Sequence, residues 1–196
     1  MSVALERTNS GALARLRALL RCEGGLMATL VAPEPDPLTA AKLVEAEQHA
    51  PPSESPASIA ASGPRTLARR EEYELLVEAI YEGYLLHYGA PRIVHVPEDD
   101  LKLLAGDRLY AIGLARLVAL GDTPAVAELA DTITLSALAQ GAGSAELAQA
   151  VWRAGARAVG WGPSPDHIRA KELVLAGAPE AIEAMRTSAM TLLASP

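Results

Sequence analysis

Hydrophobic side chains recur at helical spacing through most of the chain from residue 67 onward. Alternating runs rich in β-branched and aromatic residues, which are typical of strands, are missing from the pattern. Short connections between helices of this length are typical of an antiparallel helical bundle, so we predict an all-α fold. Glycine and proline turns separate the predicted helices, which lie at 67–88, 98–120, 123–139, 145–159, 166–175 and 179–193.

Two of these helices give specific expectations about burial. Glu74, Glu78 and Glu82 recur every fourth residue of helix 67–88, which predicts a solvated face. Gly106 and Gly113 share a face of helix 98–120. Since glycine inside a helix costs about 1 kcal/mol relative to alanine, we expect another helix to pack closely against them. The predicted core stripe of helix 98–120 consists of Leu101, Leu104, Leu109 or Arg108, Ile112, Ala115, and Val118 or Ala119.

The first third of the chain has a different pattern. Four leucines between residues 13 and 20 alternate with arginines and predict a short amphipathic helix within residues 1–32. Residues 33–65 are rich in Pro, Ser and Ala, with few large apolar side chains to offset the entropy of ordering. We therefore expect a disordered arm at 33–65, with one transient helix at 38–49, and a helical bundle domain at 66–196.

The start of the natural protein is a separate hypothesis. Glu23-Gly-Gly25 can be encoded by a purine-rich stretch similar to a bacterial ribosome-binding site, and it lies just before Met27. We hypothesise that translation starts at Met27, so that residues 1–26 are not translated. The apolar run that follows Glu23 is short and glycine-rich, which argues against a secretory signal peptide.

Composition narrows the classes of function. The net charge is −7 and the basic residues are scattered, so the chain lacks the basic footprint of a nucleic-acid-binding protein. The single Cys22 excludes an internal disulfide and fits a reducing cytoplasm. No stretch approaches the ~18 apolar residues that a transmembrane helix needs. We expect a cytoplasmic protein for which peripheral association is the one compatible form of membrane contact.

The sequence lacks the common motifs of catalytic and metal-binding sites. The chain contains no Gly-x-Ser-x-Gly elbow, no phosphate-binding glycine loop and no Glu-x-x-His pair of the di-metal bundles. Its four histidines are dispersed without the spacing of a zinc site. We therefore predict no catalytic residue, no metal and no cofactor, and we lean towards a non-enzymatic role. Trp152 and Trp161 are interpreted as packing residues, with a protein interface as the alternative.

Two segments resemble a family of helical enzymes, the trans-isoprenyl diphosphate synthases. Leu103-Leu-Ala-Gly-Asp-Arg-Leu-Tyr110 is similar to the Leu-x-Gly-Asp-x-Leu helix of that family. In the family, a stretch like 74–88 carries the Asp-Asp-x-x-Asp motif that holds magnesium and the substrate diphosphate. Here the corresponding position reads Tyr84-Leu-Leu-His-Tyr88, and no second Asp-rich motif follows residue 140. The resemblance spans about 70–145 and implies a partly isoprenoid-synthase-like fold.

This resemblance implies a role beside a prenyl synthase, without prenyl-transfer activity of the chain's own. Ionisation of a diphosphate needs magnesium held by clustered carboxylates, so we do not expect prenyl transfer by this chain alone. A non-catalytic subunit, similar in role to the small subunits of heteromeric polyprenyl diphosphate synthases, would act by binding another protein chain. The partner would be either a second copy or a different protein.

The resemblance also implies candidate ligand contacts, while other interpretations remain open. The family's Gly-Gln pair is reversed here as Gln140-Gly141, and an ion pair with an arginine is the structural alternative for Asp107. The chain could instead be an unrelated helical adaptor or scaffold of a cytoplasmic or membrane-associated assembly. A third interpretation is a pocket for an apolar ligand that is lined by four tyrosines, Tyr81, Tyr84, Tyr88 and Tyr110. The candidate ligand contacts are Tyr84, Tyr88, Asp107, Tyr110 and Gln140.

Overall fold

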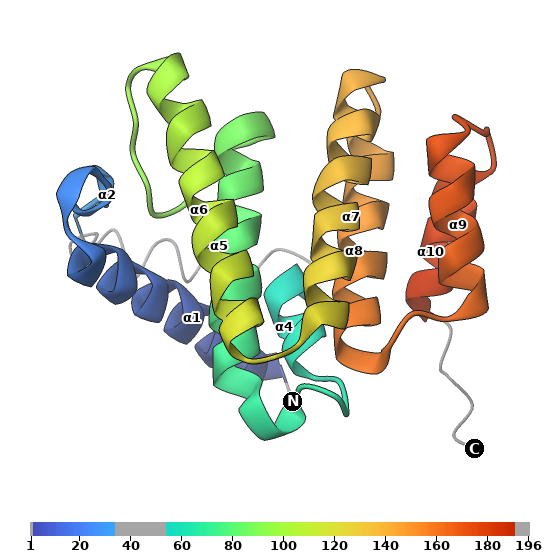
Figure 1. Cartoon of the computed structure of the whole chain (residues 1–196), viewed down its shortest axis with the longest axis horizontal. Helices are drawn as coiled ribbons and strands as arrows, with labels where there is room; N and C mark the ends of the chain where they lie inside the picture. Colours follow the sequence, from blue (N-terminus) through green and yellow to red (C-terminus); the bar gives the residue numbers. More distant parts are fainter. Residues whose placement is uncertain (1, 34–53, 191–196) are drawn as a thin grey trace.

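The computed structural model describes residues 2–33 and 54–190, with side chains from residue 11 onward. These residues form nine α-helices and no sheet, which confirms the predicted all-α bundle. Three helical hairpins stand side by side in Figure 1. Their helices are α5 (Arg70–Tyr88) with α6 (Asp99–Ala119), α7 (Thr123–Gly141) with α8 (Ala145–Trp161), and α9 (Pro165–Leu175) with α10 (Ala181–Met190).

Glycines bring α5 and α6 into close contact. A methyl group added at Gly83 would lie 2.9 Å from the carbonyl oxygen of Gly106, and one added at Gly106 would lie 3.0 Å from that of Gly83. A methyl group at Gly113 would lie 3.0 Å from the carbonyl oxygen of Leu76. The close approach expected at Gly106 and Gly113 is therefore confirmed, and α5 is the neighbour.

The buried face of α6 differs from the predicted stripe. Leu109 and Ile112 are buried as expected. Leu104 and Val118, however, are 65% and 58% exposed, and Ala115 is exposed as well. Glycine and alanine allow α5 to approach α6 closely, whereas leucine would hold it away. The side of α6 that carries Gly106 and Gly113 therefore faces α5, and Leu104 and Val118 lie on the exposed side. The residues of α6 buried against α5 and its surroundings are Ala105, Gly106, Leu109, Ile112, Gly113 and Leu117.

A short helix inside the expected disordered arm belongs to the core. All six residues of α4 (Pro56–Ala61) are buried, and the helix lies between α5 and α8 (Figure 1). Ser55 caps it by accepting a hydrogen bond from the backbone N–H of Ser58, and Thr66 Oγ1 donates to the carbonyl of Ala60 at 2.6 Å. Ile59 is the one large aliphatic side chain of this helix and the rest are small, so counting large apolar residues missed this element. The helix expected at 38–49 lies outside the described residues.

The N-terminal segment packs on the α5/α6 hairpin. The predicted amphipathic helix is present as α1 (Ser2–Glu23), in which Leu16 and Leu20 are fully buried. After α2 (Gly25–Leu30), Val31 forms an isolated antiparallel bridge with Val94 of the α5–α6 connector. A chain that started at Met27 would lack the buried leucines of α1.

Capping side chains set the starts of several helices. Asp122 caps α7 by accepting from the backbone N–H of Ala125 at 3.1 Å, with Pro124 in the first turn. Ser144 and Ser164 cap α8 and α9 in the same way. A 3-10 helix, η1 (Leu67–Arg69), precedes α5. Within the described ranges, none of the helices combines the length and the apolar character needed to cross a bilayer.

We predict that Gly63→Ala destabilises the fold. The added methyl group would fall far inside van der Waals contact with the carbonyl oxygen of Gly160, which is backbone and cannot rotate away. Such overpacking lowers the free energy of unfolding by about 3 kcal/mol, measured by urea denaturation. Gly141→Ala is the matched control because nothing lies within 4 Å of its added methyl group. Equal stability of the two variants would contradict the close α4–α8 packing.

Candidate functional site

Aromatic rings from three helices form a continuous group, which we call the aromatic column. Neighbouring ring centroids within it lie 5.0–5.8 Å apart. The column contains three of the sequence-predicted contact residues, Tyr84, Tyr88 and Tyr110. Its members are Tyr81, Tyr84, His87 and Tyr88 of α5, Tyr110 of α6 and Trp152 of α8.

Tyr84 is the centre of the column. Its ring is buried and lies 5.2 Å from Trp152 and 5.4 Å from Tyr88. Its hydroxyl oxygen accepts a hydrogen bond from Gln140 Nε2 at 2.6 Å, which ties α5 to α7. Burial raises the pKa of the Tyr84 hydroxyl, so this group is protonated at neutral pH. It can donate or accept a hydrogen bond, but it is not a general base.

Asp107 contacts a histidine instead of an arginine. Its Oδ1 lies 3.2 Å from His87 Nε2 across the α5–α6 contact, within ion-pair distance but without hydrogen-bond geometry. The Asp107 side chain is 70% exposed. On the other side, the His87 ring stacks on Tyr110 at 5.3 Å, and burial raises the pKa of the Tyr110 hydroxyl. Asp107 therefore lies at the solvent edge of the column.

The two tryptophans have different surroundings. Trp152 is almost fully buried between Tyr81 and Tyr84. Trp161 lies at the end of α8, outside the column, where the guanidinium of Arg157 covers its ring at 4.1 Å. Trp152 therefore packs in the interior, and its assignment as an interface residue stays a prediction, as does that of Trp161.

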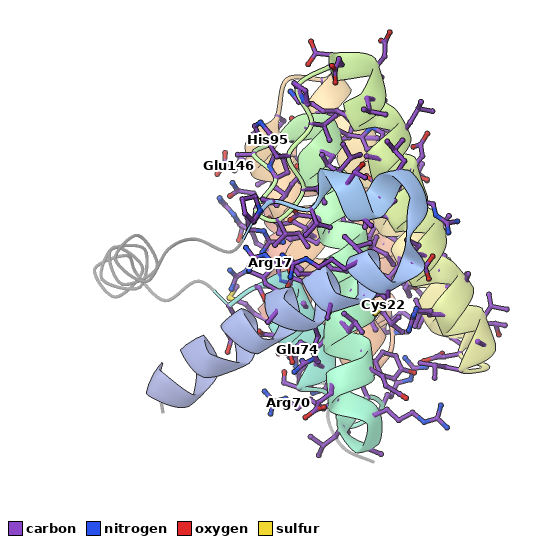
Figure 2. The ribbon with its side chains drawn as sticks, turned by 90° about the vertical axis from the view of Figure 1, so that its left-hand side faces the viewer. Arg17, Cys22, Arg70, Glu74, His95 and Glu146 are labelled. Atoms are coloured by element: carbon purple, nitrogen blue, oxygen red, sulfur yellow. The ribbon has the colours of Figure 1, made fainter. Side chains whose placement is uncertain are left out.

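The largest difference from the sequence-based expectation is the glutamate row, Glu74, Glu78 and Glu82 of α5. All three side chains are buried, so their predicted exposure is wrong. Arg15 of α1 donates from Nη2 to Glu74 Oε2 at 2.7 Å, where α1 crosses α5 (Figure 2). Arg92 of the α5–α6 connector binds both Glu78 and Glu82.

Backbone groups complete the binding of Glu82. The amide N–H groups of Arg92 and Ile93 both donate to Glu82 Oε1, at 2.6 and 2.8 Å. Arg92 Nε donates to Glu82 Oε2 at 3.2 Å, while Arg92 Nη2 donates to Glu78 Oε1. The carboxylate of Glu82 therefore holds the connector against α5 through three donors. This is the contact that positions Ile93 and Val94 beside the N-terminal segment.

The row has three carboxyl groups, and two arginines, Arg15 and Arg92, bind them. Burial raises the pKa of Glu78 despite the opposing attraction of Arg92, and burial raises that of Glu74 despite Arg15. One oxygen of each, Glu74 Oε1 and Glu78 Oε2, is buried without a hydrogen bond. The spacing of the row is visible in the sequence, but its neutralising partners are not, since Arg15 lies 59 residues from Glu74.

The glutamate row does not have the geometry of a metal site. Arg15 binds one oxygen of Glu74, and Arg92 binds one oxygen each of Glu78 and Glu82, so guanidinium groups already supply positive charge along the row. Among the described residues, no group of three or more His, Cys, Asp and Glu side chains could hold a metal ion. The row therefore acts in the fold, where it joins α1, α5 and the connector.

A second buried polar cluster joins α7, α9 and α10. His167 Nε2 lies 3.0 Å from Glu128 Oε2, and its Nδ1 lies 3.5 Å from Ser188 Oγ. Lys171 Nζ donates to Glu128 Oε1 at 2.9 Å. Burial raises the pKa of Glu128, but the hydrogen bonds from His167 and Lys171 outweigh it, so the net direction is downward.

A serine, a histidine and a glutamate in contact invite comparison with a hydrolase triad. Ser188, however, is buried and donates its hydroxyl to the carbonyl of Met185 at 2.9 Å. The adjacent cavity of about 10 Å³ is too small for a substrate. This cluster therefore fastens the α9/α10 hairpin to α7.

Comparison with known proteins found no matching family model, no matching curated protein and no matching solved structure.

We predict that Arg92→Gln destabilises the protein in a pH-dependent way. Removing the guanidinium leaves Glu78 and Glu82 buried without a counter-ion, which lowers the free energy of unfolding by about 3 kcal/mol at pH 7. Because the folded-state pKa of Glu78 lies above its unfolded value, the stability linked to its protonation is present at low pH and lost as the pH rises. The deficit should therefore be smaller at pH 5 than at pH 7.

Urea denaturation at both pH values measures the effect, with Arg69→Gln as the control. The Arg69–Glu72 pair is exposed on both sides, so the control should change stability by less than about 0.5 kcal/mol. A deficit for Arg92→Gln that is equal at both pH values would show that the carboxyls of the row are not protonated on acidification.

Proposed function

We propose that this chain is a non-catalytic helical subunit that associates with a polyprenyl diphosphate synthase in the cytoplasm. The observation that carries the proposal is an exposed apolar stripe along α6, which we call the α6 stripe. It consists of Leu104, Ala111, Ala115 and Val118, whose spacing places them on one helix face. Exposed large apolar side chains that share a face are typical of a protein interface.

A neighbouring residue of the same helix adds to this surface. Leu103, which precedes Leu104 in the chain, is 49% exposed. The small side chains of Ala111 and Ala115 at the middle of the stripe would let a partner helix approach closely. Asp107 and Arg108 flank it and would lie at the polar rim of such an interface.

The resemblance to trans-isoprenyl diphosphate synthases supports the identity of the partner. The first residue of the α6 stripe, Leu104, lies in the segment that resembles the Leu-x-Gly-Asp-x-Leu helix, and the Ala-Gly of that segment is buried against α5. The helix whose family equivalent holds magnesium carries the glutamate row, whose carboxylates bind arginines. A chain of this kind would need the Asp-rich motifs of another subunit for diphosphate chemistry.

An unrelated helical adaptor is the second candidate, since the same stripe would serve any protein partner. The two proposals differ in what the α6 stripe binds. A synthase subunit binds a chain with intact Asp-rich motifs and changes its product formation, whereas an adaptor binds proteins without prenyl chemistry.

The test is affinity purification of the full chain from its native cells, followed by an assay of the recovered partner. We expect a partner with Asp-rich motifs whose magnesium-dependent chain elongation rises at least ~10-fold when this chain is added. Leu104→Glu should weaken the association at least ~10-fold, because it places an unpaired carboxylate in an apolar interface. Leu175→Glu on α9 is the control, since Leu175 is equally exposed but lies away from the stripe.

Three results would overturn the proposal. Recovery of partners that all lack prenyl chemistry would favour the adaptor. Equal binding by the Leu104→Glu and Leu175→Glu variants would remove the α6 stripe from the interface. Prenyl transfer by the isolated chain would contradict a non-catalytic role.

A further inference from the structure

A small pocket of about 170 Å³ lies between the first turns of α5 and the end of α6. We call it the α5/α6 pocket. Its volume is close to that of one aromatic ring, since an apolar cavity of about 150 Å³ binds benzene in another protein. The pocket is lined by Glu72, Leu75 and Leu76 of α5, by Arg116 and Ala119 of α6, and by Leu120, which follows α6.

Apolar side chains form most of the wall of the α5/α6 pocket. Leu76 is 3% exposed and belongs to the central core, so its side chain is held in place. Leu75 and Leu120 are partly buried, and Ala119 is exposed. A group that enters the pocket leaves water for contact with aliphatic carbon, which favours an apolar group over a polar one.

The two charged residues of the lining do not select a charged ligand. Glu72 is negative and Arg116 is positive, and both residues are exposed. Arg69 also lies 3.9 Å from Glu72, in a pair that is exposed on both sides. Water screens charges in such positions, and opposite charges on the same lining favour neither an anion nor a cation. The pocket therefore suits a neutral apolar group.

The α5/α6 pocket borders the α6 stripe. Ala119 follows Val118 in the chain and lies one helical turn beyond Ala115, so a lining residue of the pocket is a neighbour of two residues of the stripe. Two of the four stripe residues are alanines, which offer little surface to a partner. Specific interfaces depend on a few large side chains that fill pockets. The pocket is therefore the place beside the stripe where such an anchor would lie.

We propose that one apolar side chain of the protein partner, of the size of phenylalanine, enters the α5/α6 pocket and anchors the partner on the α6 stripe. The inference rests on the proposed association and adds to it a specific contact. The small side chains of Ala111 and Ala115 let a partner helix lie close to α6, which brings a side chain of that helix within reach of the pocket.

The first test uses benzene as a probe of the pocket and needs no partner. Benzene at up to about 10 mM should cause saturable shifts of the methyl signals of Leu75, Leu76 and Leu120 in a ¹H–¹³C spectrum of the full chain. Ala119→Phe should remove these shifts, because its own ring fills the pocket. Ala130→Phe is the matched control, since Ala130 is exposed on α7 and does not line the pocket.

Two outcomes of the benzene titration would overturn the proposal. One is the absence of saturable shifts in these leucine methyl groups at about 10 mM benzene. The other is a response of the Ala119→Phe variant equal to that of the natural chain, because benzene would then bind outside the pocket.

The second test measures association of the full chain with the partner recovered from native cells. Ala119→Phe should weaken the association at least ~10-fold, because the anchor side chain loses its site, whereas Ala130→Phe should leave it within about twofold. Weaker association of the Leu104→Glu variant but not of the Ala119→Phe variant would overturn the anchor and retain the α6 stripe. Unchanged association of both variants would overturn the stripe and the anchor together.

Discussion

The buried carboxylates of α5 are the constraint on which the arrangement of the N-terminal half depends. A buried carboxylate is tolerated only when a counter-ion or several donors reach it, and α5 buries three. The partners come from outside the helix: Arg15 from α1, and Arg92 with the adjacent backbone from the connector. The glutamate row therefore decides where α1 and the connector lie, and the bridge between Val31 and Val94 follows from both.

Close packing of small residues is the second constraint. Gly83 and Gly106 bring α5 and α6 together, while α4, which has Ile59 as its one large aliphatic side chain, fills the space between α5 and α8. Since Gly106 and Gly113 of α6 face α5, Leu104 and Val118 on the other side of α6 stay exposed. The α6 stripe is thus a consequence of how the hairpin packs, and the proposed association makes use of it.

The fold class and most helix boundaries could be predicted because hydrophobic period, proline and capping residues are local signals. Asp122 is an example, since its place before Pro124 marks the start of α7. Burial of the glutamate row could not be predicted from the sequence. Glutamates at every fourth position lie on one helix face, and this spacing is the same whether that face is solvated or buried. The exposure of Leu104 was missed for a related reason: which face turns inward depends on glycines that match those of another helix. Tyr84 and Gln140 were selected through a family resemblance, and no local signal indicated that they contact each other.

The account rests on the glutamate row being part of the fold instead of a metal site. The most direct measurement is a pH titration of the glutamate side-chain carboxyl signals by ¹³C NMR, with and without magnesium. The account predicts that Glu78 titrates above the ordinary glutamate pKa of about 4.3, and that millimolar magnesium leaves its signal and that of Glu82 in place. A saturable magnesium-dependent shift of these two signals, lost in Glu78→Gln, would contradict it.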